Sequence, residues 1–191
     1  MNPNHQMKMI IKLASTSAEL QGILTLQKKN LKDNLTNEEF NKEGFVTLKH
    51  DIDTLKLMSS YANQIIAVDE GEVIGYALVM ARQLRDKIPI LKPMWVKLDE
   101  LAFGNVKISN SKFYIMGQIC IDIAYRGHGI FAKLYNMHKV EFRSDNDYCI
   151  TEVSADNLRS LNAHEKVGFV NIHSFSDKTD TWNILLLDLK N

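Results

Sequence analysis

The chain has 191 residues, and its 23 Lys and Arg balance 23 Asp and Glu, so the formal net charge at pH 7 is zero. This balance supplies no overall basic field, so neither nucleic acid nor an anionic membrane is expected as a partner. Hydrophobic residues make up 45% and charged residues 24% of the chain, the mixture of an ordinary globular protein, and no apolar run is long enough to span a membrane. Residues 1–6 lack a signal-peptide pattern, so we expect a cytoplasmic protein with one domain over residues 1–191.

The two cysteines both lie in strand-like runs, at Cys120 and Cys149. In a reducing compartment this placement predicts two buried free thiols. No Cys/His cluster has the spacing of a zinc site, so no metal is expected.

Hydrophobic periodicity and turn signals predict five elements in the first half of the chain. They are a strand over 7–13, a helix from Thr16 or Ser17 to Leu31, a short helix over 36–44, a helix over 51–61 and a β-hairpin over 65–80. The first helix carries an apolar stripe of Leu20, Ile23, Leu24 and Leu31. The short helix begins with capping-box spacing, from Thr36 to Glu39, and Gly44 ends it.

The second half alternates strands and helices. The predicted elements are a strand over 112–121, a helix over 129–142, a strand over 148–153, a helix over 157–167 and strands over 169–176 and 182–187. This order predicts a mixed α/β fold.

Residues 83–111 form a long connection for one domain, and such excursions are functional covers or contain an element of their own. Pro93 is placed to start a short helix over 94–101. The apolar face of this helix either fills an edge of the core or forms a lid over a substrate site, and both alternatives stay open.

The most informative segment runs from Ile119 to Phe131, where an apolar strand leads into Arg126, Gly127 and Gly129 and then into an amphipathic segment. Glycines let the backbone approach an anion, and a helix start offers unpaired N–H groups and a positive dipole end. The segment therefore predicts a pyrophosphate-binding turn.

Other interpretations of this turn are possible. A P-loop is excluded because no glycine precedes Lys and Ser/Thr at the required spacing. Residues 127–132 fit G-x-G-x-x-A, with Glu152 at the end of the next strand, as in a dinucleotide site. Only about 60 residues follow the turn, which is short for such a fold. A tight turn without a ligand is the third interpretation.

A second motif favours another family. The segment Asn157-Leu158-Arg159-Ser160-Leu161-Asn162-Ala163-His164-Glu165-Lys166-Val167-Gly168-Phe169 predicts a short helix with an αL cap at Gly168 and Phe169 as its apolar partner. It resembles the N-x-x-A-x-x-x-Y-x-x-x-G-F segment of the GNAT (Gcn5-related N-acetyltransferase) superfamily. Residues 126–130 resemble the same family's Q/R-x-x-G-x-G/A pyrophosphate motif.

This resemblance covers nearly the whole chain and implies an α/β GNAT-like fold. The expected sheet is mixed and mostly antiparallel, with about six or seven strands flanked by helices. It further implies an acetyl-CoA-dependent N-acetyltransferase, in which a primary amine attacks the thioester directly through a tetrahedral intermediate. The cofactor-binding residues implied in this way are Ile119, Cys120, Ile121, Arg126, Gly127, His128, Gly129, Ile130, Phe131, Ala132 and Asn157.

Two positions depart from the family pattern. Phe131 replaces a small residue, and we expect it to share a core-facing side of its helix with Leu134, Tyr135, His138 and Phe142. His164 replaces a tyrosine that serves as general acid in many relatives. His164 is therefore either the catalytic acid or a histidine held by a backbone carbonyl.

Glu152 is the candidate general base, because bacterial N-terminal acetyltransferases of ribosomal proteins have a catalytic glutamate five residues before the asparagine. An apolar pocket would raise its pKa into a useful range, whereas a surface glutamate is the alternative. Gln118 is an alternative group for positioning water, and Asp122 is expected to cap the strand end. Cys120 has little support as an acyl-carrying nucleophile.

Three functions therefore stay open: the acetyltransferase, a GNAT-like acyl-CoA-binding module without efficient catalysis, and a dinucleotide-binding protein. The acceptor, a small-molecule or protein amine, is not specified by any motif, and a homodimer is neither predicted nor excluded.

Overall fold

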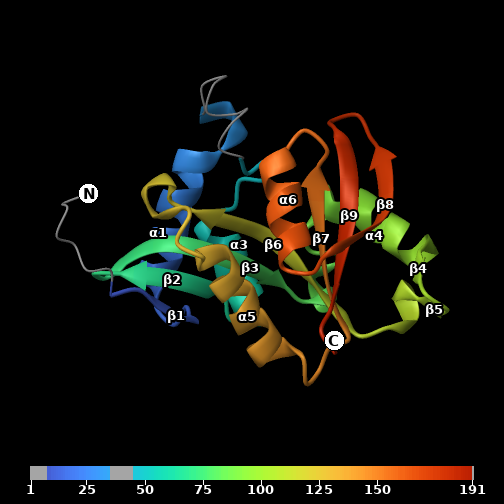
Figure 1. The fold of residues 1–191 in the computed structure, drawn as a ribbon, viewed down its shortest axis with the longest axis horizontal. Helices are drawn as coiled ribbons and strands as arrows, with labels where there is room; N and C mark the ends of the chain where they lie inside the picture. The colour runs from blue at the N-terminus through green and yellow to red at the C-terminus, as the bar shows by residue number, and fades with distance from the viewer. Residues whose placement is uncertain (1–7, 35–44, 191) are drawn as a thin grey trace. The chain divides into compact units, whose positions relative to one another are not determined.

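The computed structural model describes residues 8–34 and 45–190. The chain divides into two compact units, one of Met1–Val79 with Gln118–His138 and one of Met80–Gly117 with Lys139–Asn191. The helices are α1 (Ser17–Asn30), α3 (Ile52–Ser59), α4 (Lys92–Glu100), α5 (Ile130–Phe142) and α6 (Leu158–Lys166) (Figure 1). The strands are β1 (Ile10–Leu13), β2 (Ile65–Asp69), β3 (Glu72–Met80), β4 (Ala102–Phe103), β5 (Val106–Lys107), β6 (Phe113–Ile121), β7 (Tyr148–Ser154), β8 (Val170–Ser176) and β9 (Thr181–Asp188).

Seven strands follow one another in the hydrogen-bonded order β1-β2-β3-β6-β7-β9-β8. The pairs β1–β2, β2–β3, β7–β9 and β8–β9 are antiparallel, whereas β6 and β7 are parallel over Phe113–Ile115. The expected α/β fold with a mixed, mostly antiparallel sheet and flanking helices is therefore confirmed.

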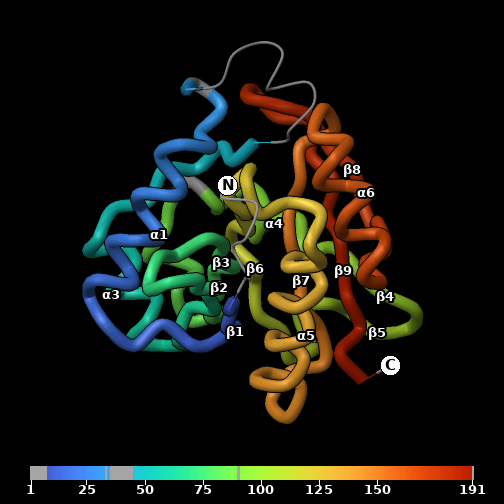
Figure 2. The backbone as a smooth tube through the Cα atoms, turned by 60° about the vertical axis from the view of Figure 1, so that its left-hand side comes forward, coloured from blue at the N-terminus to red at the C-terminus, as the bar shows by residue number. Residues whose placement is uncertain are grey.

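In the first unit, α1 begins with the capping box that its sequence encodes. The Thr16 side chain accepts from the Glu19 N–H at 3.2 Å, and the Glu19 carboxylate accepts from the Thr16 N–H at 3.0 Å. Helix α1 lies beside α3 (Figure 2). Of the predicted apolar stripe, Leu20 and Ile23 are buried and Leu24 and Leu31 are half-buried.

The buried face of α1 also contains two polar residues that the periodicity did not indicate, Gln27 and Asn30. Both have hydrogen-bond partners that are distant in the chain, and these bonds offset the cost of burying a polar side chain. Hydrophobic periodicity cannot reveal such partners.

In the second unit, the predicted helix after Pro93 is present as α4. Its side chains Met94, Trp95 and Leu98 are buried, and the Trp95 ring lies 6.0 Å from the ring of Phe113. Residues 102–107 add a small hairpin, β4–β5. Covering of the acceptor site by residues 83–111 stays a prediction.

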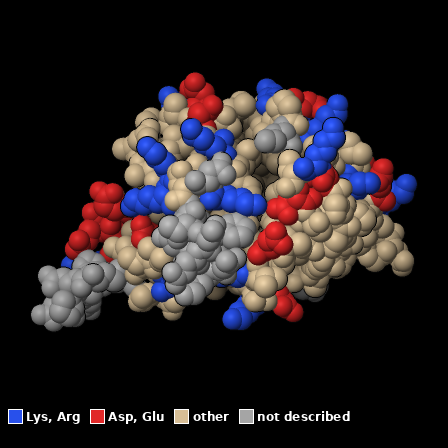
Figure 3. All heavy atoms as spheres, turned by 90° about the horizontal axis from the view of Figure 1, so that it is seen from above, with Lys and Arg blue, Asp and Glu red and all other residues tan. Residues whose placement is uncertain are grey.

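Several smaller predictions also have an outcome. Cys120 and Cys149 are buried free thiols. The predicted helix over residues 36–44 lies outside the described residues. Within residues 8–34 and 45–190, none of the helices has the length and apolar character needed to cross a membrane. Lysine, arginine and acidic side chains are interspersed on the surface shown in Figure 3, as the balanced composition suggests.

Candidate active site

The glycine turn lies in the first unit, between β6 and α5. Asp122 follows β6 and caps a short 3-10 turn, with its Oδ1 accepting from the Ala124 N–H at 3.0 Å. Gly127 and Gly129 have φ angles of 83° and 73°, and α5 begins at Ile130. Backbone of this hand is strained for most residues but not for glycine, which explains why both positions are glycine.

Both glycines face open space. A Cβ atom added at Gly127 or at Gly129 would meet no heavy atom within 4 Å. The first N–H groups of an α-helix have no acceptor inside the helix, and the dipole there is positive. The turn therefore has the space and the donors that a pyrophosphate group requires.

Arg126 holds the turn to its surroundings. Its Nε donates to the Ile121 carbonyl oxygen at 3.0 Å, and its Nη2 donates to Asn30 Oδ1 at 2.8 Å. The Arg126 guanidinium thus links the end of β6, the last residue of α1 and the glycine turn.

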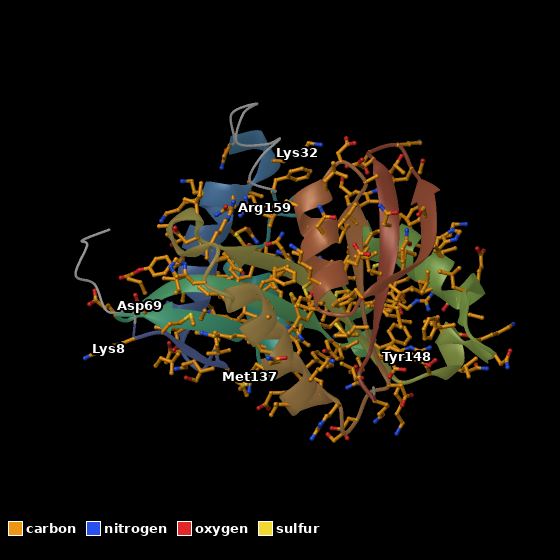
Figure 4. The ribbon with its side chains drawn as sticks, in the orientation of Figure 1. Lys8, Lys32, Asp69, Met137, Tyr148 and Arg159 are labelled. Atoms are coloured by element: carbon orange, nitrogen blue, oxygen red, sulfur yellow. The ribbon has the colours of Figure 1, made fainter. Side chains whose placement is uncertain are left out.

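A second set of hydrogen bonds holds the residue just before the arginine, Tyr125. The Tyr125 hydroxyl donates to Asp69 Oδ2 at 3.3 Å, and Asp69 Oδ1 accepts from the Lys8 N–H at 3.0 Å. Asp69 and Lys8 lie together at the end of β2 (Figure 4). The C-terminal end of the 3-10 turn is consequently held by Tyr125 as well as by Arg126.

The first turn of α5 differs in detail from the expectation. Ile130, Leu134, Tyr135 and His138 are buried, whereas Phe131 is half-buried, with its ring 5.1 Å from that of Tyr135. Ile130 therefore occupies the core position at the helix start. The Phe131 ring packs beside Tyr135 on the same helix, and it leaves the space at Gly127 and Gly129 open.

The side chain of Gln118 is enclosed in a hydrogen-bond network. Its Oε1 accepts from the Tyr76 hydroxyl at 2.7 Å and from Gln27 Nε2 at 2.9 Å, and its Nε2 donates to the Leu48 carbonyl at 2.7 Å. Both lone pairs of Oε1 are thus engaged inside the protein, which does not favour Gln118 as a group that positions water.

The same network includes His50. Gln27 Oε1 accepts from the His50 N–H at 2.9 Å, and Gln27 Nε2 lies 3.0 Å from His50 Nδ1. Burial lowers the pKa of His50 to about 4, so its ring is neutral and Nδ1 accepts from the amide. The sequence does not indicate this network, because Gln27 is 23 residues from His50 and 91 residues from Gln118.

Cys120 lies beside this network. Burial raises the pKa of its thiol to about 12, so the thiolate is scarce at neutral pH. This protonation state agrees with the low expectation for Cys120 as a nucleophile.

Glu152 lies on β7 in the second unit. Its side chain is half-buried, and within the described residues neither a hydrogen bond nor a cation contributes to the pKa of its carboxyl group. Burial, with a smaller contribution from the charge of Asp177, raises its pKa to about 7. A carboxyl group with this pKa exchanges protons readily near neutral pH.

Asn157 is the N-cap of α6. Its Oδ1 accepts from the Ser160 N–H at 3.2 Å, and its side chain is buried. The far end of α6 has the predicted αL cap: Gly168 has φ 102°, its N–H donates to Glu165, and the Phe169 N–H donates to His164. This is a Schellman motif, with Phe169 packed on the helix.

His164 is buried on α6. Its Nδ1 lies 2.8 Å from the Ser160 carbonyl oxygen, and its ring meets that of Phe169 edge-on at 5.1 Å. Because a carbonyl only accepts, Nδ1 must carry a hydrogen. Burial lowers the pKa of the ring to about 4, so it is neutral at pH 7.

The predicted site residues thus fall into two groups. Glu152, Asn157 and His164 belong to the second unit, and the predicted cofactor residues between Ile119 and Ala132 belong to the first. In the described part of the chain, no three His, Cys, Asp or Glu side chains cluster in a way that could hold a metal ion.

Comparison with solved structures identifies the fold. The chain matches yncA from Salmonella typhimurium, solved with acetyl-CoA, with a TM-score of 0.63 and 15% identity, covering 96% of this chain and 95% of that one. It matches a chain of the NatC complex bound to Gag peptide and CoA with a TM-score of 0.63 and 17% identity, covering 95% and 99%. The ribosomal-protein-S18-alanine N-acetyltransferase from Escherichia coli gives a TM-score of 0.60 and 13% identity, covering 95% and 94%. At such identities the likeness shows the fold alone.

Comparison of sequences gives the family. Curated protein sequences gave no match. The profile described as "Acetyltransferase (GNAT) family" matches residues 29–169, which include both the glycine turn and the Asn157–Phe169 segment. The chain therefore belongs to the acetyltransferase (GNAT) family.

Proposed function

We propose that the protein transfers the acetyl group of acetyl-CoA to a primary amine. The observation that carries this proposal is the turn with Gly127 and Gly129 at positive φ, open toward solvent at the start of α5. Membership in the GNAT family supports it, and two of the structurally similar proteins were solved with acetyl-CoA or CoA. The family match leaves the dinucleotide-binding alternative without support.

In this proposal the backbone N–H groups of residues 127–132 bind the pyrophosphate. Arg126 contributes by holding the turn, since its guanidinium is bonded to Ile121 and Asn30. The backbone of Ile119, Cys120 and Ile121 and the side chain of Asn157 bind the pantetheine arm, as the family resemblance implies.

Acetyl-CoA supplies a thioester carbonyl, at which a C–N bond forms and the C–S bond breaks, so that coenzyme A leaves. An alkyl ammonium group has a pKa of about 10.4, as in lysine, so the amine needs a base before it can attack at neutral pH. Glu152 is the proposed base. Its carboxylate accepts the ammonium proton, and its pKa of about 7 places it in a favourable range for this transfer.

His164 is not assigned a proton-donating step in the proposed mechanism. Its Nδ1–H is bonded to the Ser160 carbonyl, so donation from Nε2 would require a doubly protonated ring. With a pKa of about 4 such a ring is rare at neutral pH. A thiol of pKa about 8.5 leaves as a thiolate near that pH without a strong acid. The absence of a proton donor at His164 is also the observation that favours the alternative function, a CoA-binding module without efficient catalysis.

A binding experiment tests the proposal directly. Acetyl-CoA, coenzyme A and NADH are titrated separately while thermal unfolding is followed. Ligand at 100 times its Kd stabilises the fold by about 2.7 kcal/mol, which raises Tm by several degrees. We expect stabilisation by acetyl-CoA and coenzyme A. Stabilisation by NADH alone would contradict the proposal.

Gly129→Asp and Gly129→Asn form a matched pair for the turn. The two variants have the same shape and the same positive φ, which Asn and Asp tolerate better than other residues. They differ by one negative charge at the proposed pyrophosphate site. We expect Gly129→Asp to lose acetyl-CoA affinity far more than Gly129→Asn. Equal losses of affinity would show that the pyrophosphate does not bind at this turn.

A further inference from the structure

The second unit presents an aromatic and acidic face that the proposed mechanism does not use beyond Glu152. Strands β7, β9 and β8 are neighbours in the sheet, and residues directly opposite one another on neighbouring strands point to the same side. The register places Glu152 opposite Ile184, and Ile184 opposite His173. These three side chains form one row across the strands.

The next row is formed by the residues two positions along. Ser154 lies opposite Trp182, and Trp182 lies opposite Phe175. Alternation along a strand places this row on the same side as Glu152. Trp182 and Phe175 are half-buried at the end of this side, whereas Ile184 and Ser154 between the strands are buried. We call Glu152, His173, Phe175 and Trp182 the aromatic face.

The rings on β8 are already arranged for stacking. His173 and Phe175 have ring centroids 6.2 Å apart and an interplanar angle of 18°. An aromatic ligand ring extends such an arrangement with offset or edge contacts at centroid distances of about 4.5 to 7 Å.

The opposite side of the same hairpin is different in character. Asn183, between Trp182 and Ile184, accepts from Asn171 Nδ2 at 2.9 Å and from Ser174 Oγ at 2.7 Å. These polar groups satisfy one another across the two strands. The aromatic side chains are therefore confined to the side that carries Glu152.

The acidic group of the aromatic face is the Glu152 carboxyl, whose pKa of about 7 leaves it about half ionised at neutral pH. In the described part of the chain, no cationic side chain contributes to the pKa of the Glu152 carboxyl group. Asp177 acts on it through its charge, and Asp177 itself stays ionised because the N–H and hydroxyl of Thr179 hydrogen-bond to it. Burial makes the ionised form of Glu152 costly, and a ligand cation beside the carboxylate offsets that cost.

We propose that the aromatic face binds the acceptor and that the acceptor is a monocationic primary amine carrying an aromatic ring. The ammonium group lies at Glu152, and the ring packs against Trp182 and Phe175. A cation beside Trp or Phe gains further attraction from the ring quadrupole. The inference rests on the proposed acetyl transfer, and it names the substrate class for it.

The first test uses fluorescence and needs no acetyl-CoA. The chain has two tryptophans, and Trp95 is 1% exposed, so a ligand at the aromatic face affects Trp182 selectively. The probes are phenethylamine, butylamine and phenylacetate. We expect phenethylamine to quench the emission or shift it to shorter wavelength at concentrations at least tenfold below those of butylamine, and phenylacetate to have no effect. The response must disappear in Trp182→Leu, which keeps an apolar side chain.

The second test measures acetylation kinetics in matched variants. Trp182→Leu and Phe175→Leu remove rings on the aromatic face, and their controls Asn183→Ala and Ser174→Ala alter neighbouring positions on the other side. We expect the first pair to raise KM for phenethylamine at least tenfold, with an unchanged Kd for acetyl-CoA. The control pair should keep both constants within about threefold.

The outcomes separate this inference from the proposed function. Failure of acetyl-CoA to bind, together with failure of every amine to be acetylated, contradicts the proposed function. A fluorescence response to phenethylamine under those conditions would still support the aromatic face as a binding site. A different result would be acetylation of spermidine or of a peptide N-terminus with KM values that Trp182→Leu does not change. That result overturns the inference but supports the proposed function.

Discussion

Asn30 accepts a hydrogen bond of 2.8 Å from Arg126 Nη2 and thereby ties the last residue of α1 to the glycine turn, 96 positions later in the chain. The Asn30 amide also donates to the Leu26 carbonyl at 3.0 Å, so its orientation is determined by its own helix. Asn30 therefore acts on the turn through Arg126 and is a positioning residue for the proposed cofactor site.

Removal of this link should weaken acetyl-CoA binding without touching the cofactor. A hydrogen bond to a charged group contributes about 1.5 to 3 kcal/mol, and part of this loss should appear as a less ordered turn. We expect Asn30→Ala to raise the Kd for acetyl-CoA about tenfold in calorimetry. The control is Asn34→Ala, which removes another asparagine that hydrogen-bonds a carbonyl of α1. Equal Kd values for the two variants would mean that Arg126 does not need Asn30.

The pH profile should report the ionisation of Glu152. A general base must be deprotonated, so kcat/KM should rise with pH through a midpoint near 7, the pKa of this group. Glu152→Gln should lose this limb of the profile and about 10²- to 10⁴-fold in rate. Its acetyl-CoA affinity should not change.

Asp177→Asn supplies the complementary measurement. Asp177 lies in the β8–β9 connection, where its carboxylate accepts from Thr179, and an Asn side chain keeps an acceptor oxygen there. Its negative charge contributes to the raised pKa of Glu152. Neutralising it should move the midpoint of the profile to lower pH, whereas an unmoved midpoint would assign the limb to another group.

Acid should unfold the protein through its buried histidines. Burial lowers the pKa of His50 and His164 to about 4 and that of His138 to about 3, against 6.5 when unfolded. The unfolded chain therefore binds more protons between these values, and stability is lost as pH falls from 6.5 toward 4. The contribution of Glu152 to the pH dependence of stability has the opposite sign. Because its pKa is raised, the folded state binds the extra proton between pH 4.5 and 7.

Between pH 5 and pH 6 the unfolded chain therefore binds close to two protons more than the folded chain. The three histidines account for three protons, and Glu152 subtracts one. Each proton corresponds to about 1.4 kcal/mol per pH unit, so the free energy of unfolding should fall by roughly 2 to 3 kcal/mol between pH 6 and pH 5. Urea unfolding at several pH values measures this slope. Glu152→Gln should make the slope steeper, and a pH-independent free energy would contradict the assignment of neutral buried histidines.

Substitution of His164 tests whether this residue has a structural or a catalytic role. Its ring binds the Ser160 carbonyl and packs on Phe169, so His164→Ala leaves a cavity and should cost about 2 to 4 kcal/mol of stability. We expect kcat of the folded variant to stay within about threefold of the wild type from pH 6 to 9. A large loss of kcat in a variant shown to be folded would favour the proton-donating role, one of the two alternatives that the sequence leaves open.

Much of the site was predictable, because local chemistry determines it. The positive φ angles at Gly127 and Gly129 and the Schellman cap at Gly168 depend on residues a few positions apart. Glycine is the residue that accepts such angles, so the spacing of glycines in the sequence is enough to identify the turn. The order of helices and strands follows likewise from the periodicity of apolar side chains.

Other features were decided only by tertiary structure. Strand register and helix packing decide the network of Gln27, His50, Gln118 and Tyr76 and the link between Arg126 and Asn30. They also decide that Glu152, Trp182 and Phe175 share one side of the sheet. The same holds for the pKa values of Glu152 and His164, because desolvation depends on which distant chain segments surround a side chain. Sequence alone thus determined most of the elements, their caps and the glycine turn, since these require only neighbours in the chain. The protonation states and the partners of the buried polar groups required the fold, since burial and pairing are properties of residues that meet in space.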